Sequence, residues 1–143
     1  MDMEKYEFLS HTADAKFVAY GRDLGEAFSN AAVAMFSVMV KPDIVESRIK
    51  KRVTFEAENI ESLLYDWLES LLVLLDSENF ILSSVESIKI LETDKGYVLD
   101  ACFLGDSIND NYKPEGFVKA VTYNDMEIKE KEGIWCLTVV VDR

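Results

Sequence analysis

The sequence has few of the residues on which several kinds of functional site depend. Its 143 residues include one histidine, His11, and two cysteines, Cys102 and Cys136. Because zinc sites are built mainly from Cys and His ligands, so few of these residues exclude a Cys/His zinc site. Both cysteines lie in apolar stretches, which is typical of free thiols in a core. The sequence also has no glycine-rich phosphate loop and no Gly-x-Ser-x-Gly nucleophile motif.

Positive charge is scarce as well. The chain has 15 basic and 27 acidic residues, which gives a net charge of −12. Since binding to a phosphate backbone requires clustered Lys and Arg, we expect no direct, stable binding of nucleic acid. A role in nucleic-acid chemistry would then act through a protein partner or a metal ion. Most of the excess lies in residues 56–110, which hold thirteen acids and only two lysines and which we interpret as a solvated or partner-binding face.

Long apolar runs are absent too. No stretch approaches the ~20 residues that a membrane-spanning helix needs. Residues 1–5 show no basic and apolar signal pattern. We therefore expect a soluble, cytoplasmic protein with no membrane partner. The length and the apolar content of 49% predict a single packed domain over residues 1–143.

The hydrophobic periodicity predicts an α+β fold. Apolar steps of three and four predict one helix that follows Asp23 and stops before Pro42. A second apolar stripe predicts a helix that follows Asn59 and extends to about Leu75. Period-two stretches predict two short strands within residues 4–20, one at 53–55, a hairpin over 80–103 and a last hairpin from about 117 to 141. The resulting order is ββα-βα-ββ-ββ, with two helices packed on mixed or antiparallel β-sheet.

A few polar residues at the ends of predicted strands are the candidates for chemistry. Asp14 ends the bend His11-Thr12-Ala13-Asp14, and Asp142 follows the apolar run Val139-Val140-Val141. Lys119 interrupts another apolar run, where it either reaches solvent or pairs with a carboxylate. Two carboxylates and a backbone carbonyl suit Ca²⁺, Mg²⁺ or Mn²⁺. Both acids also have a simpler interpretation, because Asp14 can bond backbone amides in a turn and Asp142 can mark the chain's return to solvent.

Four blocks of sequence resemble the archease family, in the right order and over nearly the whole chain. The blocks are His11–Asp14 with residues 19–21 and 26–32, Ile60–Leu68, Val118–Tyr123 and Trp135–Asp142. The resemblance implies an archease-like single domain. It also implies an accessory protein, not an enzyme, that serves the GTP-dependent RNA-splicing ligase of tRNA splicing and maturation. Such a protein promotes guanylylation and multiple turnover of the ligase, which joins RNA 3′-phosphate and 5′-hydroxyl ends.

The resemblance also implies particular site residues. Asp14, Asp142 and the backbone of Arg143 would bind a divalent metal, with calcium expected and magnesium or manganese as alternatives. Asp14, Lys119, Asp142 and His11 would take part in activating the ligase, and no residue would be catalytic. One position departs from the pattern, since Asn124 stands where many relatives appear to carry His after the Thr-Tyr pair. A role that needs an imidazole at this position is therefore in doubt.

Two other functions remain open from the residues alone. The first is a small hydrolase that depends on a divalent metal held by the same carboxylates. The second is a general chaperone or adaptor that uses the acidic middle of the chain, including Glu61, Asp66 and Glu69.

Overall fold

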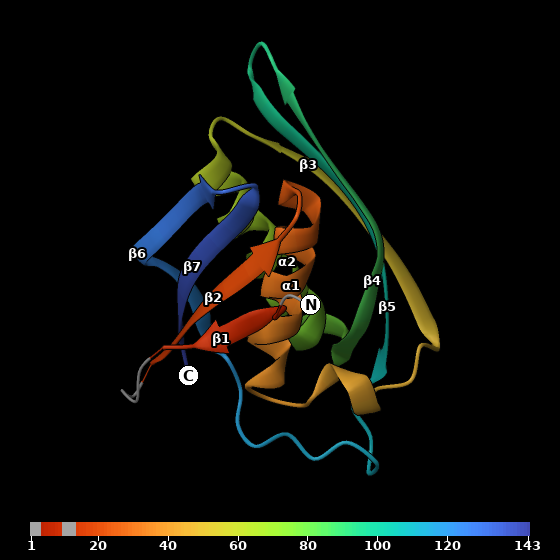
Figure 1. Cartoon of the computed structure of the whole chain (residues 1–143). Helices are drawn as coiled ribbons and strands as arrows, with labels where there is room; N and C mark the ends of the chain where they lie inside the picture. Colours follow the sequence, from red (N-terminus) through yellow and green to blue (C-terminus); the bar gives the residue numbers. More distant parts are fainter. Residues whose placement is uncertain (1–3, 10–13) are drawn as a thin grey trace.

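Two helices lie between two antiparallel β-sheets in the computed structural model, which describes residues 4–9 and 14–143 (Figure 1). The elements follow one another as β1 (Tyr6–Phe8), β2 (Ala15–Gly21), α1 (Leu24–Ser37), the 3₁₀ turn η1 (Pro42–Ile44), β3 (Ile49–Ala57), α2 (Ile60–Glu78), β4 (Phe80–Thr93), β5 (Gly96–Ser107), β6 (Ala120–Lys131) and β7 (Ile134–Asp142). This order confirms the predicted fold class and the predicted succession of elements.

The strands form two separate sheets. The first sheet has the order β1-β2-β7-β6, and the second has the order β3-β5-β4. All neighbouring strands are antiparallel. The sequence predicted antiparallel or mixed sheet without giving the number of sheets, because local periodicity does not say which distant strands pair. In the first sheet, the pairing of β2 with β7 places an early strand of the chain beside its last strand.

Both helices begin at the residues that the sequence indicated. The Asp23 carboxylate accepts a 2.8 Å hydrogen bond from the backbone N–H of Glu26. The Asn59 side chain accepts an equivalent 2.8 Å bond from Ser62. Each cap satisfies one of the backbone donors that the first turn of a helix leaves unpaired.

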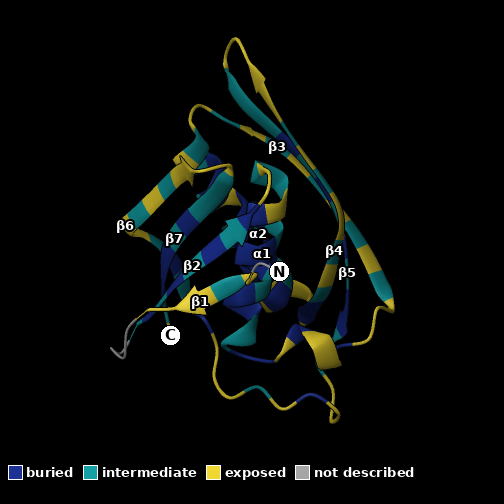
Figure 2. Ribbon diagram, viewed as in Figure 1, coloured by how far each residue is buried: buried dark blue, intermediate teal, exposed yellow. Residues whose placement is uncertain are grey.

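The hydrophobic core lies between the sheets, around the two helices. Figure 2 shows that buried residues concentrate on the helices and on the strand faces turned toward them. Trp67 of α2 is completely buried, and its indole N–H donates a 2.9 Å hydrogen bond to the carbonyl of Phe28 in α1. Helices and sheets therefore share one core. No helix in the described residues is long and apolar enough to cross a membrane.

One strand begins later than the sequence predicted. The last hairpin was expected to start near Phe117, but β6 starts at Ala120. Ala120 pairs with Asp142, the last residue of β7, so the residues before Ala120 have no strand residue opposite them. Lys119 consequently lies at the end of the connection from β5 and not inside the strand.

Candidate functional site

The pairing of β2 with β7 brings Asp14 and Asp142 to the same end of the first sheet. Ala15 pairs with Val141, so the residues one position further out, Asp14 and Asp142, are cross-strand neighbours. Ala15 and Val141 are buried on the helix side of the sheet. Because side chains alternate along a strand, the two aspartates lie on the other face. We call Asp14 and Asp142 the carboxylate pair.

The position of Asp14 beside Asp142 affects the pKa of its carboxyl group. A side-chain hydrogen bond with Asp142, partial desolvation and repulsion by the Asp142 charge all raise the pKa of Asp14 above its usual 3.8. The positive charge of Arg143 opposes this rise. Two neighbouring carboxylates that cannot both ionise freely hold a proton or attract a cation. The structure thus brings together three of the residues selected from the sequence.

Lys119 reaches this region through its backbone. Its N–H donates a 2.7 Å hydrogen bond to the carbonyl oxygen of Asp142. Its side chain is exposed and forms no ion pair with the residues that the structure describes. Of the two alternatives for Lys119, the exposed side chain matches the one in which it reaches solvent, and the contact with Asp142 is made by the backbone. His11 lies outside the described residues.

Asn124 lies in a bulge of β6 near this end of the sheet. The pairing of β6 with β7 is interrupted between Thr122 and Glu127. Asn124 is exposed, and its N–H donates a 3.2 Å hydrogen bond to the Thr122 hydroxyl. The bulge turns Tyr123 toward α2, where its ring stacks on Tyr65 with 4.5 Å between the ring centroids. The side chain at position 124 is thus available at the surface.

An ion pair that was not predicted from the sequence crosses the same sheet face. The Lys16 ammonium lies 3.5 Å from the carboxylate of Asp125, and Asp125 has a positive φ of 54° within the bulge. A cavity of about 380 Å³ opens beside this pair and is lined by Leu9, Lys16, Asp125, Met126, Glu127 and Thr138. The only local signal was the polar position of Lys16 in an alternating strand. Its partner depends on the bulge.

The carboxylate pair offers oxygen ligands to a hard cation. Residues 4–9 and 14–143 contain no group of three or more His, Cys, Asp or Glu side chains placed to hold a metal ion. The donors that are present are two carboxylates and nearby backbone carbonyls, a set that fits Ca²⁺, Mg²⁺ or Mn²⁺. The pair would therefore need backbone oxygens, water or a partner molecule to complete the coordination of such an ion.

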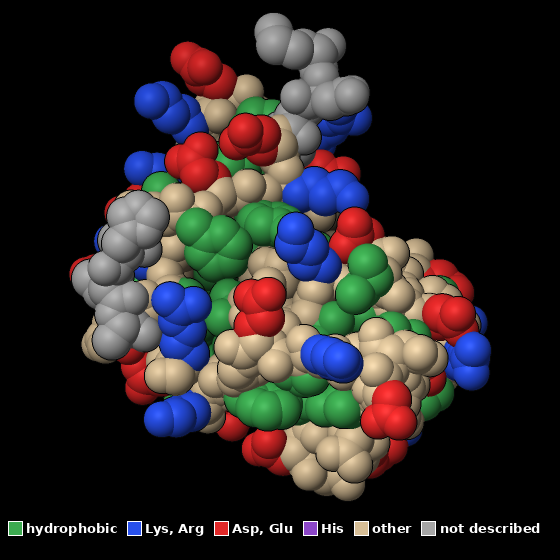
Figure 3. All heavy atoms as spheres, turned by 90° about the horizontal axis from the view of Figure 1, so that it is seen from below, with side chains coloured by type: hydrophobic (Ala, Val, Ile, Leu, Met, Phe, Trp, Pro, Cys, Tyr) green, Lys and Arg blue, Asp and Glu red, His purple; other side chains and the backbone are tan. Residues whose placement is uncertain are grey.

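The side of the molecule that faces down in Figure 1, called the lower side here, carries both positive and negative side chains. Figure 3 shows Lys and Arg side chains on this side next to Asp and Glu, with hydrophobic patches between them. The acids of the adaptor interpretation lie elsewhere in the chain, on α2, where Glu61 and Asp66 are exposed and Glu69 is half-buried. The lower side is therefore mixed in charge, although the chain as a whole has a net charge of −12.

These observations define a small α+β protein with two helices between antiparallel sheets of four and three strands, and with a carboxylate pair at one end of the larger sheet. The sequence model of the Archease protein family matches residues 6–142. The chain therefore belongs to the archease family.

Individual relatives match over almost the entire chain. The protein archease of Methanothermobacter thermautotrophicus is 44% identical over 140 residues, which cover 98% of this chain and 99% of the relative. The protein archease of Pyrococcus abyssi is 40% identical over 142 residues, with 98% and 99% covered.

Two solved structures show the same fold. The solution structure of Methanobacterium thermoautotrophicum protein 1598 superimposes with a TM-score of 0.85 at 41% identity and covers 99% of this chain and 100% of its own. The crystal structure of a Thermotoga maritima archease, described as a possible chaperone, has a TM-score of 0.60. It is 19% identical, with 100% of this chain and 99% of its own chain covered, and supports the fold alone.

Proposed function

We propose that this protein is a non-catalytic activator of a GTP-dependent RNA-splicing ligase in the cytoplasm. The ligase joins RNA 3′-phosphate and 5′-hydroxyl ends during tRNA splicing and maturation. The activator promotes ligase guanylylation and repeated turnover. Membership of the archease family supports this proposal. The observation that carries it to particular residues is the register of β2 against β7, which places Asp14 beside Asp142 at the end of the first sheet and raises the pKa of Asp14.

We infer that the carboxylate pair holds a divalent cation, with calcium as the first choice and magnesium or manganese as alternatives. Asp14 and Asp142 would supply carboxylate oxygens, and the backbone at Arg143 would supply a further oxygen. A bound cation would provide a positive charge able to contact phosphate oxygens of a nucleotide or an RNA end. The chain's own residues orient the two carboxylates: Arg143 contributes positive charge close by, and the Lys119 backbone N–H holds the carbonyl of Asp142.

The test of the function is an assay with purified ligase, RNA carrying the two kinds of end, and GTP. Adding this protein should increase the rate of ligase guanylylation and should allow each ligase molecule to seal more than one RNA. Without ligase, the protein with Mn²⁺ should not hydrolyse generic phosphoesters. Turnover of those esters would favour the metal-dependent hydrolase. Unchanged rates of ligase guanylylation and sealing would contradict the proposed role as an activator.

Metal binding at the pair should weaken as the pH falls, beginning above the pH at which an ordinary aspartate is protonated. Because contact with Asp142 raises the pKa of Asp14, a proton competes with the cation at a higher pH than at an isolated Asp. Calorimetric titration with Ca²⁺ should show weaker binding at about pH 5 than at about pH 7, together with release of a proton. The same affinity at both pH values would contradict a site built on this pair.

A further inference from the structure

The connection from β5 to β6 is long but closely held. We call residues 108–119 the strap; it crosses the lower side of the molecule from the second sheet to the first (Figure 1). Backbone hydrogen bonds fix it at intervals: Ile108 N–H to the carbonyl of Asn79 at 2.9 Å, Glu115 N–H to that of Met39 at 3.0 Å, and Lys119 N–H to that of Asp142 at 2.7 Å. The strap therefore ends at the backbone of Asp142, one of the two residues of the carboxylate pair.

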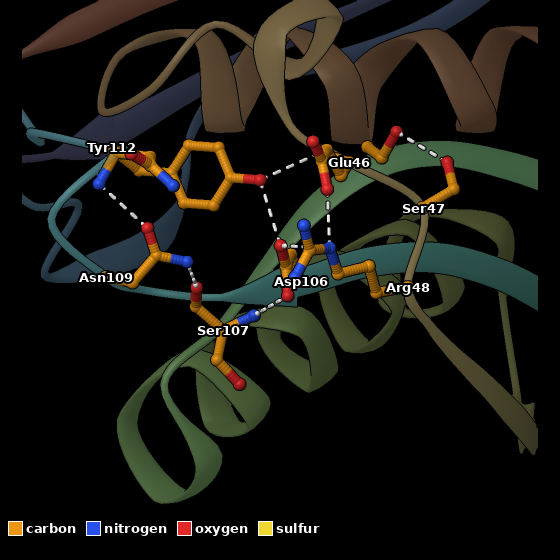
Figure 4. Close-up of polar contacts among 9 residues, drawn as sticks. Glu46, Ser47, Arg48, Asp106, Ser107, Asn109 and Tyr112 are labelled. Atoms are coloured by element: carbon orange, nitrogen blue, oxygen red, sulfur yellow. Dashed lines mark hydrogen bonds and ion pairs between the residues drawn. The ribbon is translucent and has the colours of Figure 1, made fainter.

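A buried tyrosine anchors the strap to the second sheet. Tyr112 is 5% exposed, and its hydroxyl donates a 2.9 Å hydrogen bond to Asp106, which follows Gly105 near the end of β5 and is 6% exposed. The same hydroxyl oxygen accepts a 3.0 Å bond from the backbone N–H of Glu46. Figure 4 shows the Tyr112 ring with its hydroxyl between these two partners. The hydroxyl thus uses its proton and an acceptor position, which fixes the ring.

The buried charge of Asp106 is compensated on several sides. Its second carboxylate oxygen accepts a 2.8 Å hydrogen bond from the N–H of Ser107. The guanidinium of Arg48 lies 3.7 Å from the oxygen that Tyr112 also contacts. Arg48 is held in turn by Glu46, which belongs to the segment that leads into β3. A buried carboxylate needs such partners, so loss of the tyrosine hydroxyl would leave this one incompletely satisfied.

The position of Tyr112 connects this anchor with the candidate site. Between Tyr112 and Lys119 the strap is held by the backbone bond of Glu115 and by the buried side chain of Val118. A backbone hydrogen bond such as that of Glu115 can form whichever side chain the residue carries. The Tyr112–Asp106 bond, in contrast, depends on two particular residues. Loss of this bond would therefore allow the strap to move, and the movement would extend toward Lys119.

We propose that Tyr112 and Asp106 are positioning residues for ligase activation, because they set the strap and with it the place of Lys119 beside the carboxylate pair. This inference rests on the proposed function but makes its own structural claim. Neither residue contacts the pair directly among the contacts described; both act through the strap. A hydroxyl at the second sheet thus controls the order of a site at the end of the first sheet.

The test is Tyr112→Phe, which removes the hydroxyl and keeps the ring. Hydrogen exchange at the amides of Glu115 and Lys119 should become about tenfold faster, while exchange in α2 stays unchanged. Maximal stimulation of the ligase should fall by a similar factor. The matched control is Ser47→Ala, which removes the 3.0 Å bond between the Ser47 and Ser83 hydroxyls in the neighbouring segment and leaves the strap alone. It should leave both measurements as in the wild type.

A double variant separates positioning from general stability. If Tyr112 acts through Lys119, Lys119→Ala combined with Tyr112→Phe should reduce stimulation no further than Lys119→Ala alone. Additive losses would overturn the inference, as would unchanged exchange at Lys119 in Tyr112→Phe. If the wild-type protein does not stimulate the ligase, the proposed function fails. The exchange experiment still decides then whether Tyr112 controls the strap.

Discussion

Replacing Asp14 or Asp142 with Asn should abolish most of the stimulation of the ligase without unfolding the protein. Each change removes one of the two charged oxygen ligands. We expect stimulation to fall at least about tenfold, since replacing a residue that only supports a metal ligand already has an effect of that size. The substitutions preserve side-chain shape. Asp142→Asn also preserves the backbone carbonyl that accepts the Lys119 N–H. The measurement is the rate of ligase guanylylation at saturating activator.

The same substitutions should also change the stability of the protein, in a direction that follows from the pKa of Asp14. Contact with Asp142 raises the pKa of Asp14 in the folded protein above 3.8, so the folded state holds the shared proton more tightly than the unfolded chain. The associated stability is present at low pH and is lost as the pH rises through the raised pKa. At neutral pH the two charges repel, so Asp14→Asn should have an equal or higher melting temperature without added metal. At about pH 4 this advantage should disappear.

Asp66→Asn is the matched control, because it makes the same chemical change at an exposed position on α2. It should keep full stimulation of the ligase. Full stimulation by both Asp14→Asn and Asp142→Asn would contradict a role for the pair. Loss of activity in Asp66→Asn alone would instead favour the adaptor that uses the acidic face.

Local signals in the sequence were sufficient for the elements of the fold. Asp23 and Asn59 cap the two helices as predicted, because an N-cap bond involves residues only three positions apart. The seven leucine and tryptophan positions of the α2 stripe from Leu63 to Leu75 are buried, and only Ile60 at its start is half-buried. Turn residues also marked the hairpin between β4 and β5. These signals act over short distances and need no knowledge of the tertiary fold.

Long-range partners could not be predicted in the same way. The contact of Asp14 with Asp142 depends on the register of β2 against β7, which strand periodicity does not specify. Their places at the ends of predicted strands made both aspartates candidates, and the resemblance to a family assigned them to one site; the spacing of the residues could not show that they meet. The Tyr112–Asp106 bond was missed because the turn-rich composition of residues 105–116 predicts only a surface loop. The late start of β6 has the same origin, since it depends on where β7 ends.

Gly105→Ala should strongly destabilise the protein, although it adds only one methyl group. Gly105 lies in the middle strand of the second sheet, where it pairs with Ile49 and Leu82. A Cβ atom there would lie 2.0 Å from the carbonyl oxygen of Ile81 and 2.6 Å from the ring of Phe80. The backbone of Ile81 cannot move aside as a flexible side chain can. We therefore expect a loss of about 3 kcal/mol or more in the free energy of unfolding. Denaturant unfolding measures it.

Gly25→Ala is the control, since the same methyl group enters α1 with its closest contact 3.2 Å from a methyl group of Ile88. Alanine favours a helix by roughly 0.5–1 kcal/mol over glycine, which offsets a mild contact. The two variants should thus differ by several kcal/mol, and equal unfolding midpoints would contradict the packing around Gly105. The residue after Gly105 is Asp106, so a shifted β5 would also displace the anchor of the strap. Partly folded Gly105→Ala protein should therefore show fast exchange at Lys119 before its helices unfold.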